Sequence, residues 1–141
     1  MRMKTLLISM IVLFASSVSG LAETVVIVHP DNPLASLKRD QVVDIYMGRK
    51  QNFPGGNTAF PIDLPPAAAD RAEFYRTLVG KSVAQINAYW ARLLFTGRAT
   101  PPKALATPAA VLKSVRENRD AIAYINSTDL DGKVKVVFRV K

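Results

Sequence analysis

Hydrophobic and polar positions divide this chain into short segments of two kinds, some with the period of a strand and some with that of a helix. Residues 24–28 form an unbroken β-branched run, which is typical of a strand covered on both faces. We expect further strands at 59–63, 121–125 and 134–140. Proline at position 61 predicts that its strand lies at a sheet edge or ends there.

Helical spacing of apolar residues fills the stretches between these strands. Helices are expected to start near residues 38, 70, 82 and 107. For the second helix, Asp70 and Glu73 predict a capping box, and Gly80 marks its end. The helix that starts at Ser82 has the clearest apolar stripe, so its aromatic residues, including Phe95, are expected in the core. The order β, α, β, α, α, α, β, β predicts an α/β domain with a mostly parallel sheet flanked by helices.

The amino-terminal segment has the pattern of a secretory signal peptide. Arg2 and Lys4 precede an apolar run at 6–14, and the small residues Gly20 and Ala22 are spaced for cleavage after Ala22. The alternative, an uncleaved membrane anchor, is disfavoured because the run is far shorter than the ~20 residues that span a bilayer. We therefore expect a signal peptide at 1–22, one domain at 23–141, a periplasmic location and no stable membrane insertion after cleavage.

Composition narrows the chemistry. The chain has no cysteine, which excludes thiol nucleophiles, thiolate metal sites, disulfides and a lipidated cysteine. His29 is the only histidine, and no nucleophile elbow, phosphate-binding loop or dinucleotide fingerprint accompanies it. We expect no catalytic residue, no cofactor and no metal. The formal net charge of +8 is scattered, and outside the cytoplasm a basic surface meets small anions or anionic lipid rather than nucleic acid.

The best candidate for a binding site is the passage from the end of the second strand into the second helix. Asp63 ends that strand, and Ala68, Ala69, Asp70 and Arg71 open the helix. Free N–H groups and the helix dipole favour an anion at such a place, and an arginine can form two parallel hydrogen bonds to an oxyanion. The alternative is a capped helix whose arginine lies in solvent or pairs with Asp70 or Glu73.

Several segments together resemble the periplasmic phosphate-binding proteins of bacterial ABC transporters, in particular their short, single-lobe relatives. They span most of the chain after the signal peptide: residues 25–28 with Asn32-Pro33, Leu37 with 40–48, 61–63, 88–98 with Pro101-Pro102, and 121–125. The resemblance implies one lobe of a type II periplasmic-binding-protein fold. It also implies that phosphate is held by helix N-termini, hydroxyls, an arginine and an aspartate, for which only Arg71, the backbone around Ala69 and, more loosely, Asp63 correspond.

Two departures from the family pattern leave the function open. Ala67-Ala68-Ala69 stands where the family has Ser-Gly-Thr, and the glycine- and serine-rich loop after the first strand has no counterpart, as if the chain began with the second lobe. One hypothesis is a binding protein for phosphate or a related oxyanion that serves an ABC permease. Another is a sensory or interaction module that kept the fold, lost the pocket and docks on an envelope receptor. A third, an enzyme, would need His29 to meet a carboxylate in a cleft.

Overall fold

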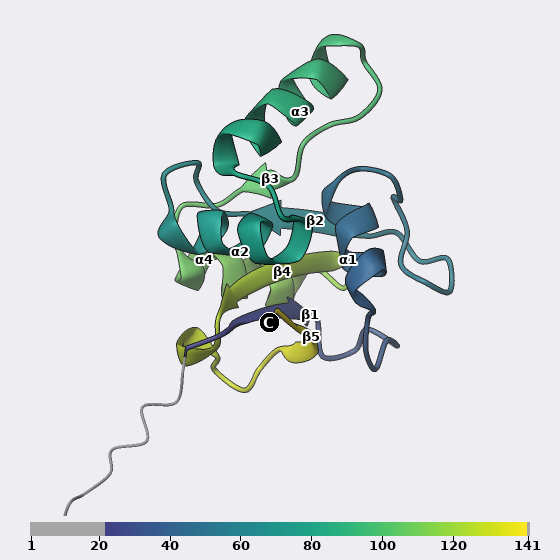
Figure 1. Ribbon diagram of the computed structural model, residues 1–141. Helices are drawn as coiled ribbons and strands as arrows, with labels where there is room; N and C mark the ends of the chain where they lie inside the picture. Colours follow the sequence, from purple (N-terminus) through teal and green to yellow (C-terminus); the bar gives the residue numbers. More distant parts are fainter. Residues whose placement is uncertain (1–21, 141) are drawn as a thin grey trace, which may run out of the picture.

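The computed structural model describes residues 22–140, so the predicted signal peptide lies outside the described residues except for Ala22. Strands and helices alternate along most of the chain (Figure 1). The strands are β1 (Thr24–Val28), β2 (Phe60–Asp63), β3 (Lys103–Ala104), β4 (Ala121–Asn126) and β5 (Lys135–Val140). The helices are α1 (Arg39–Tyr46), α2 (Ala69–Val79), α3 (Val83–Phe95), α4 (Pro108–Glu117) and the short 3-10 helix η1 (Ser127–Asp129).

The five strands form one sheet in the order β3-β2-β4-β1-β5. β2 pairs parallel with β3 and β4, whereas β1 pairs antiparallel with both β4 and β5. Four strands therefore point the same way and only β1 opposes them, which confirms the predicted α/β class with a mostly parallel sheet. Because β1 lies between β4 and β5, both its edges are paired. Both its faces are covered as well, since all five of its residues are buried.

The strand β2 lies inside the sheet and still accommodates Pro61. The strand lies inside the sheet order, although its proline predicted an edge or a strand end. Phe60 and Pro61 pair only with β4, and pairing with β3 begins at Ile62. The proline, which has no N–H to donate, thus sits where one side of the strand has no neighbour. The two-residue β3 itself was not predicted, because a proline-rich loop precedes it.

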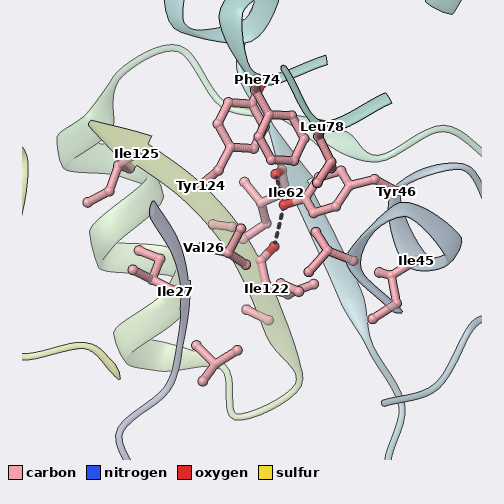
Figure 2. Packing of buried hydrophobic residues seen from close by; sticks show 14 of the residues in the cluster. Val26, Ile27, Ile45, Tyr46, Ile62, Phe74, Leu78, Ile122, Tyr124 and Ile125 are labelled. Atoms are coloured by element: carbon pink, nitrogen blue, oxygen red, sulfur yellow. Dashed lines mark hydrogen bonds between the residues drawn. The ribbon is translucent and has the colours of Figure 1, made fainter. Parts of the chain in front are cut away.

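The core fills both sides of the sheet. On one side the Tyr124 ring of β4 stacks on Phe74 of α2, with ring centroids 3.8 Å apart, and meets the ring of Tyr46 from α1 edge-on (Figure 2). The Tyr46 hydroxyl donates to the backbone carbonyls of Ile62 and Ile122, at 2.8 and 3.2 Å, so this buried group ties β2 to β4. Side chains alternate along a strand, and the next residue, Ile125, points to the other side, toward α4.

The start of α2 differs from the prediction. Ala68, not Asp70, is the N-cap residue, and no side chain caps the helix. Glu73 does not complete a capping box either, because its carboxylate binds Arg76 at 2.8 Å and also accepts from Thr77. An alanine at the cap leaves the first amides of the helix without the side-chain acceptor that serine or aspartate supplies. The predicted end at Gly80 is confirmed, with a left-handed φ of 75°.

The helix α3 begins as predicted and then leaves the body of the protein. Ser82 and Gln85 form a reciprocal capping box, in which the Gln85 N–H donates to the Ser82 hydroxyl and the Ser82 N–H donates to Gln85 Oε1. Figure 1 shows α3 rising away from the sheet and the other helices. Only Ile86 and Trp90 of its residues are buried, and Phe95, expected in the core, is 94% exposed. Among residues 22–140 no helix combines the length and apolarity required to cross a membrane.

Candidate functional site

Asp63 lies at the end of β2 and is buried, with 5% of its surface exposed. Its carboxylate accepts three hydrogen bonds around it: from the Tyr75 hydroxyl at 2.7 Å, from the Tyr124 hydroxyl, and from the backbone N–H of Leu64 at 2.8 Å. These donors come from α2, β4 and the loop after β2, so the carboxylate joins three parts of the fold. A buried carboxylate is tolerated only when it is satisfied in this way.

Arg71 completes the cluster from the first turn of α2. Its Nε lies 3.3 Å from Asp63 Oδ2, and its Nη2 donates to Asn87 Oδ1 of α3 at 3.1 Å. The side chain is buried, and Nη1 has no hydrogen-bond partner among the described residues. Arg71 and Tyr75 are four positions apart, which places both on one face of α2 toward Asp63. The guanidinium carbon also lies 5.1 Å from the Tyr75 ring centroid, within cation–π range.

The electrostatics of this cluster follow from burial around one negative charge. Burial raises the pKa of both the Tyr75 and the Tyr124 hydroxyls well above the usual value near 10, and the Asp63 carboxylate raises each pKa further. Burial likewise raises the pKa of Tyr46, followed by the effect of Asp63. Ionising any of these tyrosines would place a second negative charge beside a buried carboxylate. The hydroxyls therefore remain hydrogen-bond donors across the physiological pH range.

The remaining predicted residues form the open N-terminus of α2. Ala69 is exposed, and Ala68 and Asp70 are half-buried. The Ala68 carbonyl accepts the N–H groups of Arg71 and Ala72, at 3.1 and 3.3 Å. Within the described residues no acceptor is found for the N–H groups of Ala69 and Asp70. The helix thus presents two free amides and the positive end of its dipole, with the Asp70 carboxylate as the competing charge.

The structure therefore separates the predicted site into two parts. Asp63 and Arg71 form a buried pair, while residues 68–70 stay at the surface. The alternative in which Arg71 lies in solvent or pairs with Asp70 or Glu73 is wrong, since Asp63 is its partner. Three clefts in the described part of the surface are lined by other residues. An anion would reach the exposed amides of α2 but not the buried guanidinium.

Sequence reasoning missed three members of the cluster: Tyr75, Tyr124 and Asn87. Tyr75 could have been found, because it follows Arg71 by four residues on the same predicted helix face. Tyr124 carries a weaker signal as a hydroxyl-bearing residue within a buried strand, since a buried tyrosine needs a hydrogen-bond partner. Asn87 carries no local signal, because only the packing of α2 against α3 brings it to Arg71.

The other reactive groups do not assemble into a centre. His29 follows β1, is half-buried, and accepts the N–H of Asp31 on Nδ1 at 3.0 Å. Within the described residues this turn bond is the one hydrogen bond of the His29 side chain, and the imidazole forms no ion pair with a carboxylate. Across residues 22–140 no group of three or more histidine, aspartate or glutamate side chains is close enough to hold a metal ion.

Comparison with known proteins identifies the fold. No family model and no curated protein matches the chain. Among solved structures it is similar to an ABC-type phosphate transport receptor from Vibrio cholerae, with 19% identity, a TM-score of 0.66, and coverage of 82% of this chain and 45% of the receptor. The chain is also similar to a phosphate ABC transporter substrate-binding protein from Clostridium perfringens, solved with bound phosphate, with 22% identity and a TM-score of 0.67. The match covers 82% of this chain and 44% of that protein.

A third similar structure is PstS from Borrelia burgdorferi, at 11% identity and a TM-score of 0.62, covering 82% of this chain and 46% of that protein. The chain thus spans less than half the length of each of these proteins. The resemblance to phosphate-binding proteins is confirmed at the level of structure. This chain has the fold of one lobe of the substrate-binding proteins of phosphate ABC transporters.

Proposed function

We propose that this chain is a periplasmic binding protein rather than an enzyme, and that it takes phosphate or a related oxyanion in association with ABC-type phosphate transport. One observation supports the proposal most: the free amides of Ala69 and Asp70 open the helix α2 on a fold shared with phosphate receptors. The positive end of a helix and unpaired N–H groups are the elements from which phosphate sites are built. The predicted export signal would place this site among small anions outside the cytoplasm.

The affinity of such a site is expected to be low. The amides are exposed, so each hydrogen bond to an anion contributes only about 1 kcal/mol net. The alanines in the first turn supply no hydroxyl, and the Arg71 guanidinium is already held by Asp63 and Asn87. Two such bonds and the helix dipole contribute about 2–3 kcal/mol, less than the roughly 4 kcal/mol of a millimolar Kd, so the expected Kd is on the order of 10 mM. We therefore expect a low-affinity site that is occupied only where the phosphate concentration is high.

The test is the melting temperature of the purified protein in phosphate against chloride at equal ionic strength. We expect phosphate to raise it, and Ala69→Pro to reduce the rise, because proline takes away one of the two free amides. Ala69 is the first residue of α2, where proline is tolerated, so the variant should fold. Val83→Pro, at the same position of α3, is the matched control and should keep the rise. No rise at tens of millimolar phosphate would contradict the proposal.

A second candidate function is an envelope sensory or interaction module without a small ligand. It is favoured by the Asp63 carboxylate, which occupies the donors of Arg71, Tyr75 and Tyr124 as a bound anion would. A built-in anion of this kind satisfies an anion pocket permanently. The same melting experiment separates the two roles, because this role requires that phosphate and chloride give equal melting temperatures.

A further inference from the structure

An apolar stripe on α3 runs from the core into solvent. Ile86, Trp90 and Leu94 are spaced four apart and share one face of the helix. Their exposed fractions are 0%, 6% and 57%, so burial fades toward the end that rises from the body (Figure 1). Phe95, next to Leu94, is 94% exposed. Large apolar groups gathered on a projecting element are a feature of surfaces that bind another molecule.

A cleft lies directly beside this stripe. Its volume is about 340 Å³, and Trp90 forms part of its wall together with residues from the start of β2 and from the loop before β3. Phe60, 43% exposed, contributes an aromatic ring from β2. The cleft is at the start of β2, whereas Asp63 is at its end, so the cleft is separate from the candidate anion site. Its size is enough for one or two bulky side chains but small for an extended ligand.

The charged side chains that line the cleft all have one sign. Lys50 and Lys103 line it, and no aspartate or glutamate does. Neither ammonium group has a hydrogen-bond or ion-pair partner in the described part of the chain, and Arg98 adds an exposed cation in the loop that returns from α3. Two unpaired cations beside an apolar wall are complementary to a ligand that carries carboxylates next to an apolar group.

We propose that this cleft and the exposed end of α3 dock an acidic segment of a partner protein. A bulky apolar side chain of the segment fills the cleft against Trp90 and Phe60, Leu94 and Phe95 cover its flank, and neighbouring carboxylates pair with Lys50 and Lys103. A second copy of this basic chain is disfavoured as the occupant, because it would bring further lysines to these two. This surface goes beyond anion binding and gives the interaction role a defined site.

The chain offers a direct probe, since Trp90 is its single tryptophan and its emission reports on the cleft. The titrants are short blocked peptides with one phenylalanine or leucine flanked by aspartate and glutamate. The control peptides carry lysine at the flanking positions. The protein variants are Lys50→Glu with Lys103→Glu, and Leu94→Ala, which changes a side chain 57% exposed and should leave the fold intact. Lys81→Glu with Lys113→Glu, two exposed lysines elsewhere, is the matched control pair.

We expect the acidic peptides to shift the Trp90 emission saturably and less strongly at high salt, and the lysine peptides to leave it unchanged. The Lys50 and Lys103 variant should weaken binding roughly tenfold, the sum of two lost surface charge pairs, whereas the control pair should not. The proposal is overturned by an unchanged emission with every acidic peptide, or by equal binding to the variant and the wild type.

Two other outcomes would also overturn it. Phenylacetate that binds as tightly as the best peptide would make the cleft a small-molecule site. Self-association removed by Leu94→Ala would make the occupant a second copy. The phosphate melting experiment on the Lys50 and Lys103 variant separates peptide docking in the cleft from phosphate binding at α2. That variant retains the start of α2, so its melting temperature should rise with phosphate as that of the wild type does.

Discussion

The Nε of Arg71 lies 3.3 Å from Oδ2 of Asp63, and both side chains are less than a tenth exposed. A charge pair in such surroundings is stabilising only as long as both partners are present, because each has lost its hydration. Asp63 is held further by two tyrosine hydroxyls and a backbone amide, while Arg71 relies on Asp63 and Asn87. The pair therefore joins α2 to the sheet and to α3.

Removing one partner of this pair should be costly. We expect Arg71→Met to lower the free energy of unfolding by about 3–5 kcal/mol, because Asp63 is then a buried charge without a counterion. Adding Asp63→Asn to Arg71→Met should restore part of the loss. Urea denaturation of the single and double variants measures this. Arg76→Met, which breaks the exposed pair with Glu73, is the control and should change little. A double variant whose loss equals the sum of the single losses would contradict the coupling.

The raised tyrosine pKa values predict a loss of stability at alkaline pH. In the folded protein Tyr46, Tyr75 and Tyr124 keep their protons above pH 10, whereas in the unfolded chain they ionise near 10. The unfolded state thus binds fewer protons than the native state at such pH, and the free energy of unfolding falls as pH rises. The stabilising contribution is complete below pH 10 and is lost progressively above it.

Denaturation at pH 8 to 11, followed by tyrosinate absorbance, tests this. We expect part of the tyrosine absorbance to appear only together with unfolding. Tyr75→Phe should lower stability at pH 8 by about 1.5–3 kcal/mol, since its hydrogen bond goes to a charged group. It should also make the free energy of unfolding fall less steeply with pH above 10, because one of the three tyrosines with a raised pKa is gone. An unchanged slope in this variant would show that Tyr75 does not carry the effect.

Gly48 is predicted to be the least replaceable glycine of the described chain. It has a φ of 72°, and a Cβ there would lie 2.7 Å from the Trp90 ring. We expect Gly48→Ala to destabilise by about 1–3 kcal/mol and to shift the emission of Trp90. Gly80→Ala is the matched control, since φ is 75° and a Cβ would meet nothing within 4 Å. Gly80→Ala should lower the stability less than Gly48→Ala does. If thermal unfolding showed equal losses of stability, contact with the Trp90 ring would not explain the effect at Gly48.

Asp70 is predicted to weaken anion binding at the start of α2. It is the second residue of the helix, where its negative charge competes with an anion for the helix dipole. Asp70→Asn should therefore increase the rise in melting temperature caused by phosphate. Asp40→Asn, at the same position of α1, is the matched control and should leave that rise as it is. A phosphate response that is the same in wild type and Asp70→Asn would argue against an anion at these amides.

The sequence predicted the elements better than the contacts between them. β-branched runs and caps placed β1, α1 and α3 within one or two residues, because these signals are local. The mostly parallel sheet followed from the order of strands and helices. The cap of α2 was wrong, because Asp70 and Glu73 fit a local pattern that the chain does not use. The burial of Phe95 was also wrong, since helical spacing cannot reveal that the end of α3 leaves the core.

The candidate site was predicted in part for the same reason. Asp63 and Arg71 were singled out as neighbours of one strand end, and the structure does bring them together. Their surroundings were not predictable, because Tyr124 and Asn87 reach them only through packing of β4 and α3. The free amides of α2 were expected because a helix begins there after a strand end, and the alanines predicted only that no hydroxyl donors accompany them. Whether phosphate occupies them stays a prediction.

The pairing of β1 with β4 and β5 sets the order in which the molecule can assemble. Thr24 finds its partners in Asn126 and Val140, at the opposite end of the described chain. Contacts of such high sequence separation form late, because a long loop must close before they stabilise anything. The inner strand β1 must therefore wait for β4 and β5, which lie far along the chain. An emerging chain of this design keeps both edges of β1 unpaired until β4 and β5 have been synthesised.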